Sequence, residues 1–582
     1  MCGIFGLINN RNTFSQNFIE KNFDKGKYRG PESSNIIYPT QKIVLGFHRL
    51  AINGLTEASD QPIVVNNVTL ICNGEIYNYK EIYKTLNITP KTNSDCEVII
   101  HLYLKYGIEQ TLKLLDGVFS FILYDRNNLE LPIYIARDPY GVRPLYKLKL
   151  KIKQNEKDTT NIHGFASEIK SLNEFYDETD SEIKELQQFQ PGTYSKLYLT
   201  LDKAICDYDY SVVNKKYFML PFTYELDKTI YSEETILNTI CNLLCDAVKK
   251  RVTTCEREIA CLLSGGLDSS LITGLVCKFA INSTEKVKTF SIGLQGSDDL
   301  KYARQVAEYL ETDHHEVVVT EDEMFDAIPE VIEKIESYDT TTVRASVGNY
   351  LISKYIKQNS NAKVIFNGDG SDEVTGGYMY FHKSPDEYSF DAECRRLLDD
   401  IYMFDVLRSD KTISSNGLEA RTPFLDRCFV QFYLSLPPHI RSHNINNKCE
   451  KYLLRKAFQH KGVIPESVLW RTKEAFSDGV SGNKKSWYEI IDDKIKERFM
   501  DKYDKDFKTN YKENIPTTRE QRYYRDIYDS LYPNMSHVLP YFWMPKFIYA
   551  TDSSARTLDI YKEKNSVRLE TSNCNKNLKL ES

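Results

Sequence analysis

Hydrophobic residues in the first part of the chain fall into short runs that are broken by turn signals. KIVLGF, NNVTLICNG, GVFSFILYD and PIYIARD, all within residues 1–205, are examples. Runs of this length, bounded by glycine, asparagine and aspartate, are typical of β-strands. DCEVIIHLYLKYG, residues 95–107, has the apolar spacing of a helix instead. Residues 147–161 are polar and charged, and we expect an exposed hairpin extension without a catalytic role there.

The pattern changes after residues 205–232, where strand-like runs begin to alternate with helix-like ones. Such alternation predicts a doubly wound parallel sheet. The chain beyond it is predicted to be largely helical up to about residue 550. The remaining residues lack sustained apolar periodicity, which predicts a loose tail. The predicted strands are 258–263, 286–294, 314–319 and 362–368, and the first predicted helices are 269–280 and 298–310. The expected domains are 2–205 and 206–550, followed by the tail 551–582.

Composition narrows the classes of protein to which the chain can belong. With 582 residues, 41% of them hydrophobic, the chain can build several cores. Its net charge of −7 argues against nucleic acid as the main partner. No stretch approaches the roughly 18 consecutive apolar residues of a membrane helix, and MCGIFGLINN lacks the basic region of a signal peptide. The 13 cysteines form no CxxC pair and are expected to be reduced thiols. We therefore expect a cytosolic protein.

The N-terminal sequence MCGIFGL places a cysteine directly before a strand-like run. If Met1 is removed, Cys2 carries a thiol and a free α-amino group on the same carbon. An α-amine has a pKa of about 7.7 to 8.0 and can act as the base for a nucleophile on its own residue. Cys2 is therefore a candidate nucleophile that supplies its own base. The alternative is an unimportant, frayed terminus.

LLSGGLDSS, residues 262–270, leaves a predicted strand and enters a predicted helix. Ser264, Gly265 and Gly266 can present N–H groups there, and the helix adds its positive end, so the loop suits a phosphate. Asp268 can hold Mg²⁺ against such phosphates. An ordinary glycine turn is the alternative, and the loop is not a Walker motif. The sequence resembles the pyrophosphate loop of ATP pyrophosphatases, which cleave ATP between the α and β phosphates.

Further motifs, in one order from residue 2 to about residue 550, carry a resemblance to a known family. MCGIFG, YRGPESS (28–34), HRLAI (48–52), CNGEIYN (72–78), SDCEVI (94–99) and ARDPYGVRPLY (136–146) resemble class II glutamine amidotransferases with an N-terminal nucleophile. LLSGGLDSS, TFSIGL (289–294), TTVRAS (341–346), NGDGSDEVTGGY (367–378), DVLRSDKTISSNGLEARTPFLD (405–426) and LWRTKEAFSDGV (469–480) resemble glutamine-hydrolysing asparagine synthetase. The resemblance implies an α/β multidomain protein. An N-terminal Ntn-hydrolase αββα sandwich is followed by a doubly wound parallel α/β ATP-pyrophosphatase domain with a largely helical C-terminal part.

The same resemblance implies roles for residues of the first domain. Cys2 would attack the side-chain amide of glutamine, with the oxyanion stabilised by Asn73 and the backbone of Gly74. The α-carboxylate of glutamine would be bound by Arg49 and its α-ammonium by Glu75 and Asp95. Taken alone, Arg49 could be a surface ion pair and Asn73–Gly74 a hairpin turn. The implied glutamine-binding set is Arg49, Leu50, Ala51, Ile52, Asn53, Asn73, Gly74, Glu75 and Asp95.

For the second domain the resemblance implies an ATP site. Thr341, Arg344 and Lys473 would meet phosphates or the negative charge of the transition state. Mg²⁺ would be held by Asp268 and Asp372. The implied ATP- and pyrophosphate-binding set is Leu262, Ser264, Gly265, Gly266, Leu267, Asp268, Ser269, Ile292, Thr341, Arg344, Asn367, Gly368 and Lys473.

Asp369, Asp372 and Glu373 form an acidic cluster directly after the predicted strand 362–368. Three carboxylates this close need a cation or an ammonium, unless they form only a solvated charge run. Asparagine synthetases usually carry glutamate at the position of Asp369, in a loop like GEGSDE. We expect Asp369 to be essential for adenylating aspartate, with Asp372 carrying that chemistry as the alternative. The implied catalytic set is Cys2, Asn73, Gly74, Asp369 and Lys473.

The two implied sites make one reaction, the ATP-dependent synthesis of L-asparagine from L-aspartate and L-glutamine through β-aspartyl-AMP. Ammonia from the first site would reach the second through an internal path. The expected partners are L-glutamine, L-aspartate, ATP and Mg²⁺, without nucleic acid or membrane, and a homodimer is left open. One alternative is a related amidotransferase or β-lactam-type synthetase with another acceptor. The other is an inactive regulatory homologue, against which the presence of Cys2, Arg49, Asn73, Asp268 and Lys473 argues.

Overall fold

The computed structural model describes residues 1–153, 159–177, 181–200, 206–223, 232–280, 285–444, 448–471, 485–503, 511–550 and 552–554. Three sheets organise these residues, two of them antiparallel and one parallel. Within the described ranges, no helix has the length and apolar character needed to cross a membrane.

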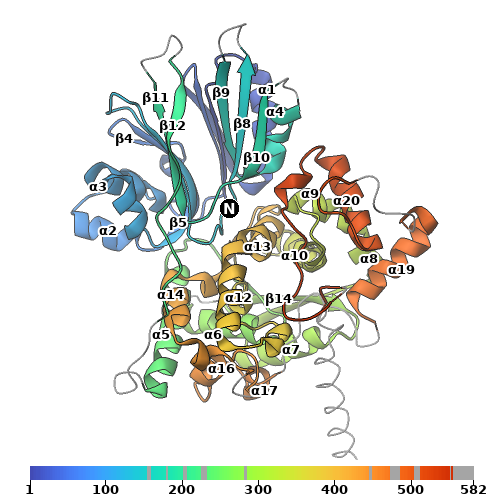
Figure 1. The fold of residues 1–582 in the computed structure, drawn as a ribbon. Helices are drawn as coiled ribbons and strands as arrows, with labels where there is room; N and C mark the ends of the chain where they lie inside the picture. Colours follow the sequence, from blue (N-terminus) through green and yellow to red (C-terminus); the bar gives the residue numbers. More distant parts are fainter. Residues whose placement is uncertain are drawn as a thin grey trace, which may run out of the picture.

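The N-terminal region is a sandwich of two six-stranded antiparallel sheets. The first sheet has the order β10-β8-β9-β1-β3-β2 and the second β12-β11-β7-β6-β5-β4. Helices α1 and α4 cover the outer face of the first sheet, and α2 and α3 cover that of the second (Figure 1). The predicted αββα sandwich is therefore confirmed. Its strands are β1 (Gly3–Ile8), β2 (Ser33–Thr40), β3 (Ile43–Arg49), β4 (Ile63–Val65), β5 (Val68–Ile76), β6 (Gly117–Asp125), β7 (Ile133–Arg137), β8 (Tyr146–Lys153), β9 (Thr159–Ala166), β10 (Ile183–Gln188), β11 (Thr193–Leu199) and β12 (Tyr208–Lys216), and its helices α1 (Gln16–Asp24), α2 (Tyr79–Leu86), α3 (Val98–Leu114) and α4 (Asn173–Asp177).

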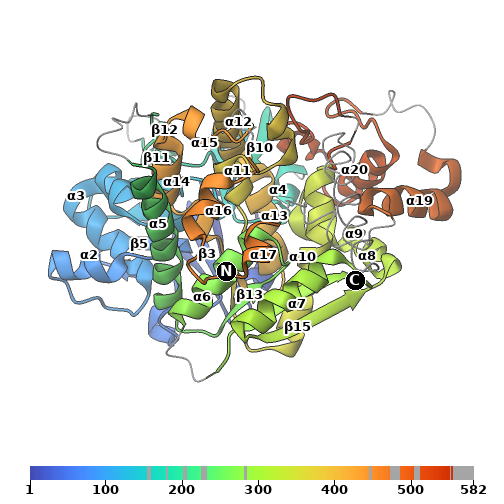
Figure 2. The same cartoon turned by 90° about the horizontal axis from the view of Figure 1, so that it is seen from below.

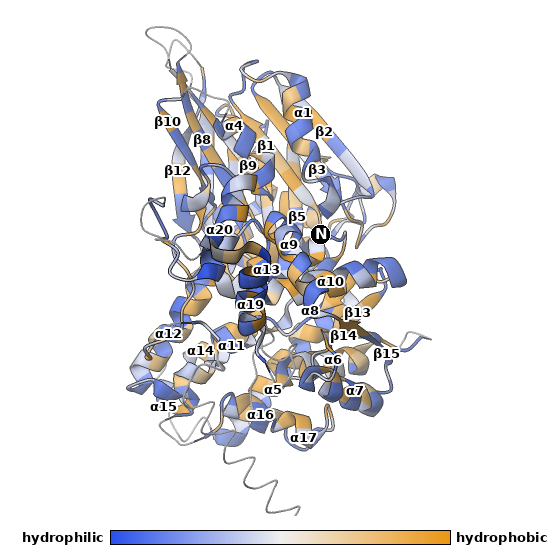
Figure 3. Cartoon of the chain, turned by 90° about the vertical axis from the view of Figure 1, so that its right-hand side faces the viewer, coloured by the Kyte–Doolittle hydropathy of each residue, from blue (hydrophilic) through white to orange (hydrophobic). Residues whose placement is uncertain are grey.

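Apolar side chains of both sheets form the core of the sandwich. Ile4 and Leu45 from the first sheet lie in one buried cluster with Ile71 and Ile122 from the second. Figure 3 shows the hydrophobic colouring concentrated along strands such as β1 and β5. Burial of apolar surface on this scale is the main driving force for folding. The sandwich therefore provides a rigid support for residues at the ends of its strands.

The predicted exposed hairpin at residues 147–161 is instead part of the first sheet. β8 and β9 pair along their whole length, and Leu148 and Leu150 of β8 are buried. Their alternation with lysines is the period-two pattern of a strand with one face in the core. The connecting residues 154–158 lie outside the described ranges.

The second region is built around a parallel five-stranded sheet with the order β15-β14-β13-β16-β17. The order reverses at β13, which makes the sheet doubly wound, as predicted. Helices α6 and α7 lie on the face that is nearest the viewer in Figure 2. The strands are β13 (Ile259–Leu262), β14 (Lys288–Leu294), β15 (Asp313–Val319), β16 (Val364–Phe366) and β17 (Glu419–Arg421), and the helices α5 (Glu233–Thr253), α6 (Leu267–Phe279), α7 (Asp298–Leu310), α8 (Glu321–Asp326), α9 (Ile328–Ile335), α10 (Thr340–Asn359), α11 (Ser371–Thr375), α12 (Glu387–Asp400), α13 (Asp405–Ser414), α14 (Arg427–Ser435), α15 (Pro438–Arg441), α16 (Tyr452–Phe458), α17 (Glu466–Leu469), α19 (Trp487–Phe499) and α20 (Arg519–Leu531).

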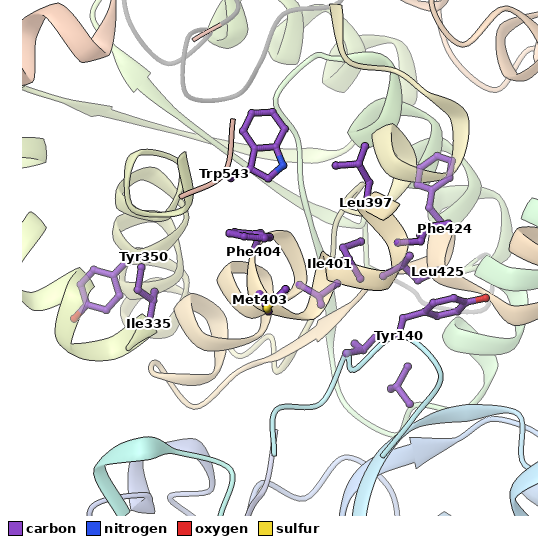
Figure 4. Packing of buried hydrophobic residues seen from close by; sticks show 14 of the residues in the cluster. Tyr140, Ile335, Tyr350, Leu397, Ile401, Met403, Phe404, Phe424, Leu425 and Trp543 are labelled. Carbon is purple, nitrogen blue, oxygen red and sulfur yellow. The ribbon is translucent and has the colours of Figure 1, made fainter. Parts of the chain in front are cut away.

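The two regions share one continuous core. Tyr140, from a loop of the sandwich, belongs to the same buried cluster as Ile401 and Leu425 from the helical region. Figure 4 shows these side chains together, with Phe404 and Trp543 further along the same cluster. The largely helical C-terminal part that the sequence predicted is thus confirmed and packs against the sandwich.

Buried ion pairs accompany this apolar contact. Arg29 of the sandwich donates to Asp410 of α13 at 2.7 Å and to Glu168 at 2.7 Å. Lys411, the next residue of α13, lies 3.2 Å from Glu168 and also contacts Glu336. All five side chains are at most 1% exposed. Charges so deeply buried need partners, and here the partners come from both regions.

Candidate active sites

Met1 is buried between the sandwich and the parallel sheet, and Cys2 beside it is half-buried. The α-ammonium of Met1 donates to the carbonyl of Leu418 at 3.1 Å, and burial lowers its pKa to about 6. The Cys2 thiol contacts the carbonyl of Leu50 at 3.6 Å. Burial raises the pKa of this thiol to about 11. With Met1 in place, the thiol is therefore protonated at neutral pH and is a poor nucleophile.

Asn73 is a buried polar residue on β5. Its side chain is 1% exposed, and neither its amide nitrogen nor its oxygen has a hydrogen-bond partner. Buried polar groups without partners are rare and call for an explanation, such as a ligand. The adjacent Gly74 pairs with Phe119 of β6, and a Cβ on Gly74 would come within 2.5 Å of the Val118 carbonyl. Asn73 and Gly74 therefore belong to a strand, and the hairpin-turn alternative is wrong.

Glu75 and Asp95 bring two carboxylates to the same end of β5. Asn53 donates to Glu75 Oε2 at 2.7 Å, and Asp95 accepts from the N–H of Ile76 at 2.6 Å. Burial, together with Glu419 and Asp95, raises the pKa of Glu75 well above its ordinary range. Burial also raises the pKa of Asp95 to about 6. An ammonium ion placed here would satisfy both carboxylates, because an opposite charge favours their ionised form.

Arg49, at the end of β3, is buried and not a surface residue. Its guanidinium contacts Asp60 and the carbonyl of Gly54, and it donates to the carbonyl of Thr56 at 3.0 Å. The segment after Arg49 contacts both the thiol and one carboxylate of the site, since Leu50 contacts Cys2 and Asn53 contacts Glu75. The surface-ion-pair alternative is therefore wrong, whereas contact with a glutamine carboxylate stays a prediction.

A second candidate site is a cavity of about 190 Å³ at the carboxyl ends of β13, β14 and β16. This is the switch point of the sheet, where ligands bind in open α/β folds. Thr341 enters the cavity from the first turn of α10, and its buried hydroxyl has no hydrogen-bond partner. The predicted residues that line the cavity are Leu262, Ser264, Gly266, Leu267, Asp268, Ser269, Ile292, Thr341, Asn367, Gly368, Asp369, Asp372 and Glu373.

The loop after β13 closes on itself at the start of α6. The hydroxyls of Ser264 and Ser269 lie 3.0 Å apart, and the N–H of Ser264 donates to Ser269 at 3.2 Å. Gly265 has φ +69°, and a Cβ there would come within 2.4 Å of the Ala303 nitrogen. Glycine is thus required for the loop to pack on α7, although Gly265 does not line the cavity.

Lys451 holds the two predicted metal ligands together. Its ammonium lies 2.7 Å from both oxygens of Asp268 and 2.8 Å from Asp372. The two carboxylates thus converge on one positive charge, and one or two carboxylates with phosphate oxygens form the usual Mg²⁺ environment. The donor set therefore fits a divalent cation, although the described residues contain no group of three or more acidic, histidine or cysteine side chains suited to a metal.

Arg408, on α13, pairs with the acidic loop on the other side of the cavity. Its guanidinium donates to Asp369 at 2.9 Å and to Asp405 at 3.1 Å. The second carboxylate oxygen of Asp369 is buried and has no partner. Burial, then Asp405 and Asp372, raise the pKa of Glu373 well above its ordinary range. The acidic cluster is therefore paired with the Arg408 cation, and the alternative of a solvated run of charges is wrong.

Comparisons with known proteins identify the family. A family model described as asparagine synthase matches residues 239–393 and 383–543, and one described as glutamine amidotransferase domain matches residues 1–204. Asparagine synthetase [glutamine-hydrolyzing] of Gallus gallus is 41% identical over 97% of this chain and 99% of the relative. The enzymes of that name from Mus musculus and Homo sapiens are 41% and 40% identical over the same shares. The chain belongs to the glutamine-hydrolysing asparagine synthetases.

In this glutamine-hydrolysing asparagine synthetase, Gly265 and Arg344 are the described residues of the predicted ATP- and pyrophosphate-binding set that do not line the cavity. Arg344 donates to Glu520 at 2.8 Å and to Asp552 at 2.8 and 2.7 Å, and it does not line the cavity. This arrangement does not support a phosphate contact for Arg344. Lys473 lies outside the described residues.

The sequence reasoning missed the cations that do line the cavity. Lys451, Arg408 and Arg471 each pair with an acidic residue there, and Arg471 also donates to the carbonyl of Gly265 at 3.0 Å. Charge alone could not select them among the 75 lysines and arginines of this asparagine synthetase.

Proposed function

We propose that the protein makes L-asparagine from L-aspartate, L-glutamine and ATP through β-aspartyl-AMP, releasing AMP, pyrophosphate and L-glutamate. The observation that carries the proposal is the similarity to glutamine-hydrolysing asparagine synthetases over 97% of the chain. The coexistence of a half-buried N-terminal cysteine and a cavity at the switch point of a parallel sheet supports it. In this proposal residues 2–205 are the glutaminase domain, residues 206–550 the synthetase domain and residues 551–582 a tail.

In the first step, Cys2 Sγ attacks the side-chain carbonyl carbon of glutamine, and the carbon–nitrogen bond breaks to release ammonia. Water then hydrolyses the thioester to glutamate. Asn73 and Gly74 would donate to the oxyanion, where one such donor is worth roughly 3 to 4 kcal/mol of the barrier. The step requires removal of Met1, because the α-amine must sit on Cys2 to accept the thiol proton.

In the second step, a β-carboxylate oxygen of aspartate attacks the α-phosphorus of ATP, and the bond to the bridging oxygen breaks to release pyrophosphate. Ammonia then displaces AMP from the acyl carbon. Asp268 and Asp372 would hold Mg²⁺, which offsets phosphate charge when bound, and Lys451 would then be free to move from these carboxylates to a phosphate. Lys473 is proposed to meet the transition-state charge, and Asp369 to take part in adenylation.

Ammonia is proposed to travel inside the protein, because in neutral water most of it is protonated and no longer nucleophilic. The two regions share a continuous buried core, which would separate such a route from bulk solvent. We further propose a cytosolic enzyme that acts on small molecules, without nucleic acid or membrane as a partner.

The test is to incubate the protein with ATP, aspartate and either glutamine or ammonium chloride, and to measure AMP, pyrophosphate and asparagine. Cys2→Ala should abolish synthesis from glutamine and retain it from ammonium chloride. Cys428→Ala, at an exposed cysteine of α14, is the matched control and should retain both activities. Loss of the ammonia-dependent activity in a folded Cys2→Ala protein, or absence of AMP with the unaltered enzyme, would overturn the proposal.

A further inference from the structure

Arg421 reaches from the parallel sheet into the candidate glutamine site. Its side chain is fully buried, and one terminal nitrogen donates to Glu75 Oε2 at 3.1 Å. The Nε atom donates to Glu419 at 3.0 Å. The guanidinium also donates to the carbonyl of Thr254 at 3.3 Å and contacts that of Arg251. With its donors shared among four residues, the guanidinium has one fixed position.

The main chain of the same residue contacts the other site. Arg421 pairs with Phe366 in the parallel sheet, and its carbonyl accepts the N–H of Asn367 at 3.1 Å. Asn367 lines the nucleotide cavity. A side-chain substitution of Arg421 leaves this main-chain hydrogen bond available, so the two connections can be tested separately.

The cation that hydrogen-bonds to Glu75 comes from outside the sandwich. It is buried beside Glu419 and Asp95, and its partner within the sandwich is the neutral amide of Asn53 at 2.7 Å. A buried carboxylate that lies beside other carboxylates and has no cation near it tends to take up a proton. A protonated Glu75 could not form an ion pair with the α-ammonium of an amino acid. Arg421 and Arg143 are the cations that oppose this protonation, and of the two Arg421 makes the hydrogen bond.

We propose that Arg421 is a positioning residue of the glutamine site, which orients Glu75 toward the α-ammonium of the bound substrate and favours its ionised form. A residue of the synthetase region would then contribute to the recognition of glutamine at the site in the glutaminase region. The inference rests on the proposed function, because it requires glutamine to bind beside Cys2.

The test compares two substrates that differ only at the group that Glu75 would bind. L-glutamine carries an α-ammonium, whereas glutaramate (4-carbamoylbutanoate) has hydrogen in its place. Ammonia release from each is measured as kcat/KM for the unaltered enzyme, Arg421→Met and Arg421→Lys. Arg421→Met should lower the preference for glutamine over glutaramate by about tenfold or more, as expected on truncating one partner of a buried charge pair. The loss should lie in the KM for glutamine, and Arg421→Lys, which keeps the charge, should restore much of the preference.

The controls separate this role from a general role in folding. Asparagine synthesis from ammonium chloride reports on the nucleotide site and should survive in both variants. If Arg421→Met does not fold, Arg421→Met with Glu419→Gln replaces it, because that pair removes both charges of the buried ion pair.

Equal losses on glutamine and glutaramate would mean that Arg421 only supports the fold, and the inference would be wrong. A rise in the preference for glutamine would mean that Arg421 competes with the substrate for Glu75, which would also overturn it. Absence of glutamine hydrolysis in the unaltered enzyme would instead refute the proposed function.

Discussion

Replacing Lys411 by methionine should destabilise the protein far more than the same change at the surface. The ammonium of Lys411 is fully buried, 3.2 Å from Glu168 and in contact with Glu336. Methionine keeps most of the side-chain volume but leaves two buried carboxylates with less positive charge. Removing one partner of a buried ion pair costs about 3 to 5 kcal/mol. We expect the lower end, because Arg29 still donates to Glu168 at 2.7 Å.

A loss of about 3 kcal/mol corresponds to a fall in Tm of about 6 to 12 °C for a large domain. Scanning calorimetry near neutral pH should compare the unaltered protein with Lys411→Met and with Lys21→Met as the matched control. Lys21 pairs with Glu174 at 3.0 Å, but its side chain is 64% exposed, so its loss should cost less than about 1 kcal/mol. Equal falls in Tm for the two variants would refute the reasoning that burial makes the loss of the Lys411 ion pairs more costly.

Three further outcomes are expected. Intact-mass measurement should show a protein without Met1, and full glutamine-dependent activity in a protein that keeps Met1 would contradict the terminal-amine mechanism of Cys2. Asp369→Ala should remove aspartate-dependent pyrophosphate release with either nitrogen donor while glutamine hydrolysis survives, whereas Asp369→Glu should stay active; near-normal release from the alanine variant would shift attention to Asp372. Stability should decline as the pH falls from about 4.5 toward 2, because the cations around buried Glu168 outweigh the effect of burial and lower its pKa to about 2, below its ordinary 4.5. This contribution is complete above the unfolded pKa and is lost on protonation, so a Tm that does not change across this range would be inconsistent with it.

The sequence predicted the parts of the fold that depend on local patterns. The loop Ser264–Ser269 lies at the end of a strand and the start of a helix, as the run of apolar residues and the two glycines indicated. β17 was not predicted, because its three residues, Glu419–Arg421, are too short to show any period and carry charges at both ends. Those charges are compatible with a buried strand only because Arg421 and Glu419 pair with each other and with the sandwich.

Cations at the candidate sites were not predictable for a different reason. Lys451 and Asp268 are 183 positions apart, so their contact depends on how the start of α16 is placed against the first turn of α6. The case of Arg344 is the reverse, since the motif TTVRAS implied a phosphate contact, whereas the structure pairs this arginine with Glu520 and Asp552. A motif identifies a residue type at a position, but the direction in which its side chain points depends on the groups that surround it.

One helix shows how the two candidate sites are kept in a fixed relation. α13 directs Arg408 toward the nucleotide cavity, where it binds Asp369, and directs Asp410 toward Arg29 of the sandwich. Residues two apart lie on different faces of a helix, so ten residues are enough to contact both regions. Apolar contacts alone would tolerate sliding between the regions, whereas a buried ion pair that shifts loses its partner and leaves an uncompensated charge. The proposed passage of ammonia between the two sites requires such a fixed relation, and these buried charges provide it at the boundary.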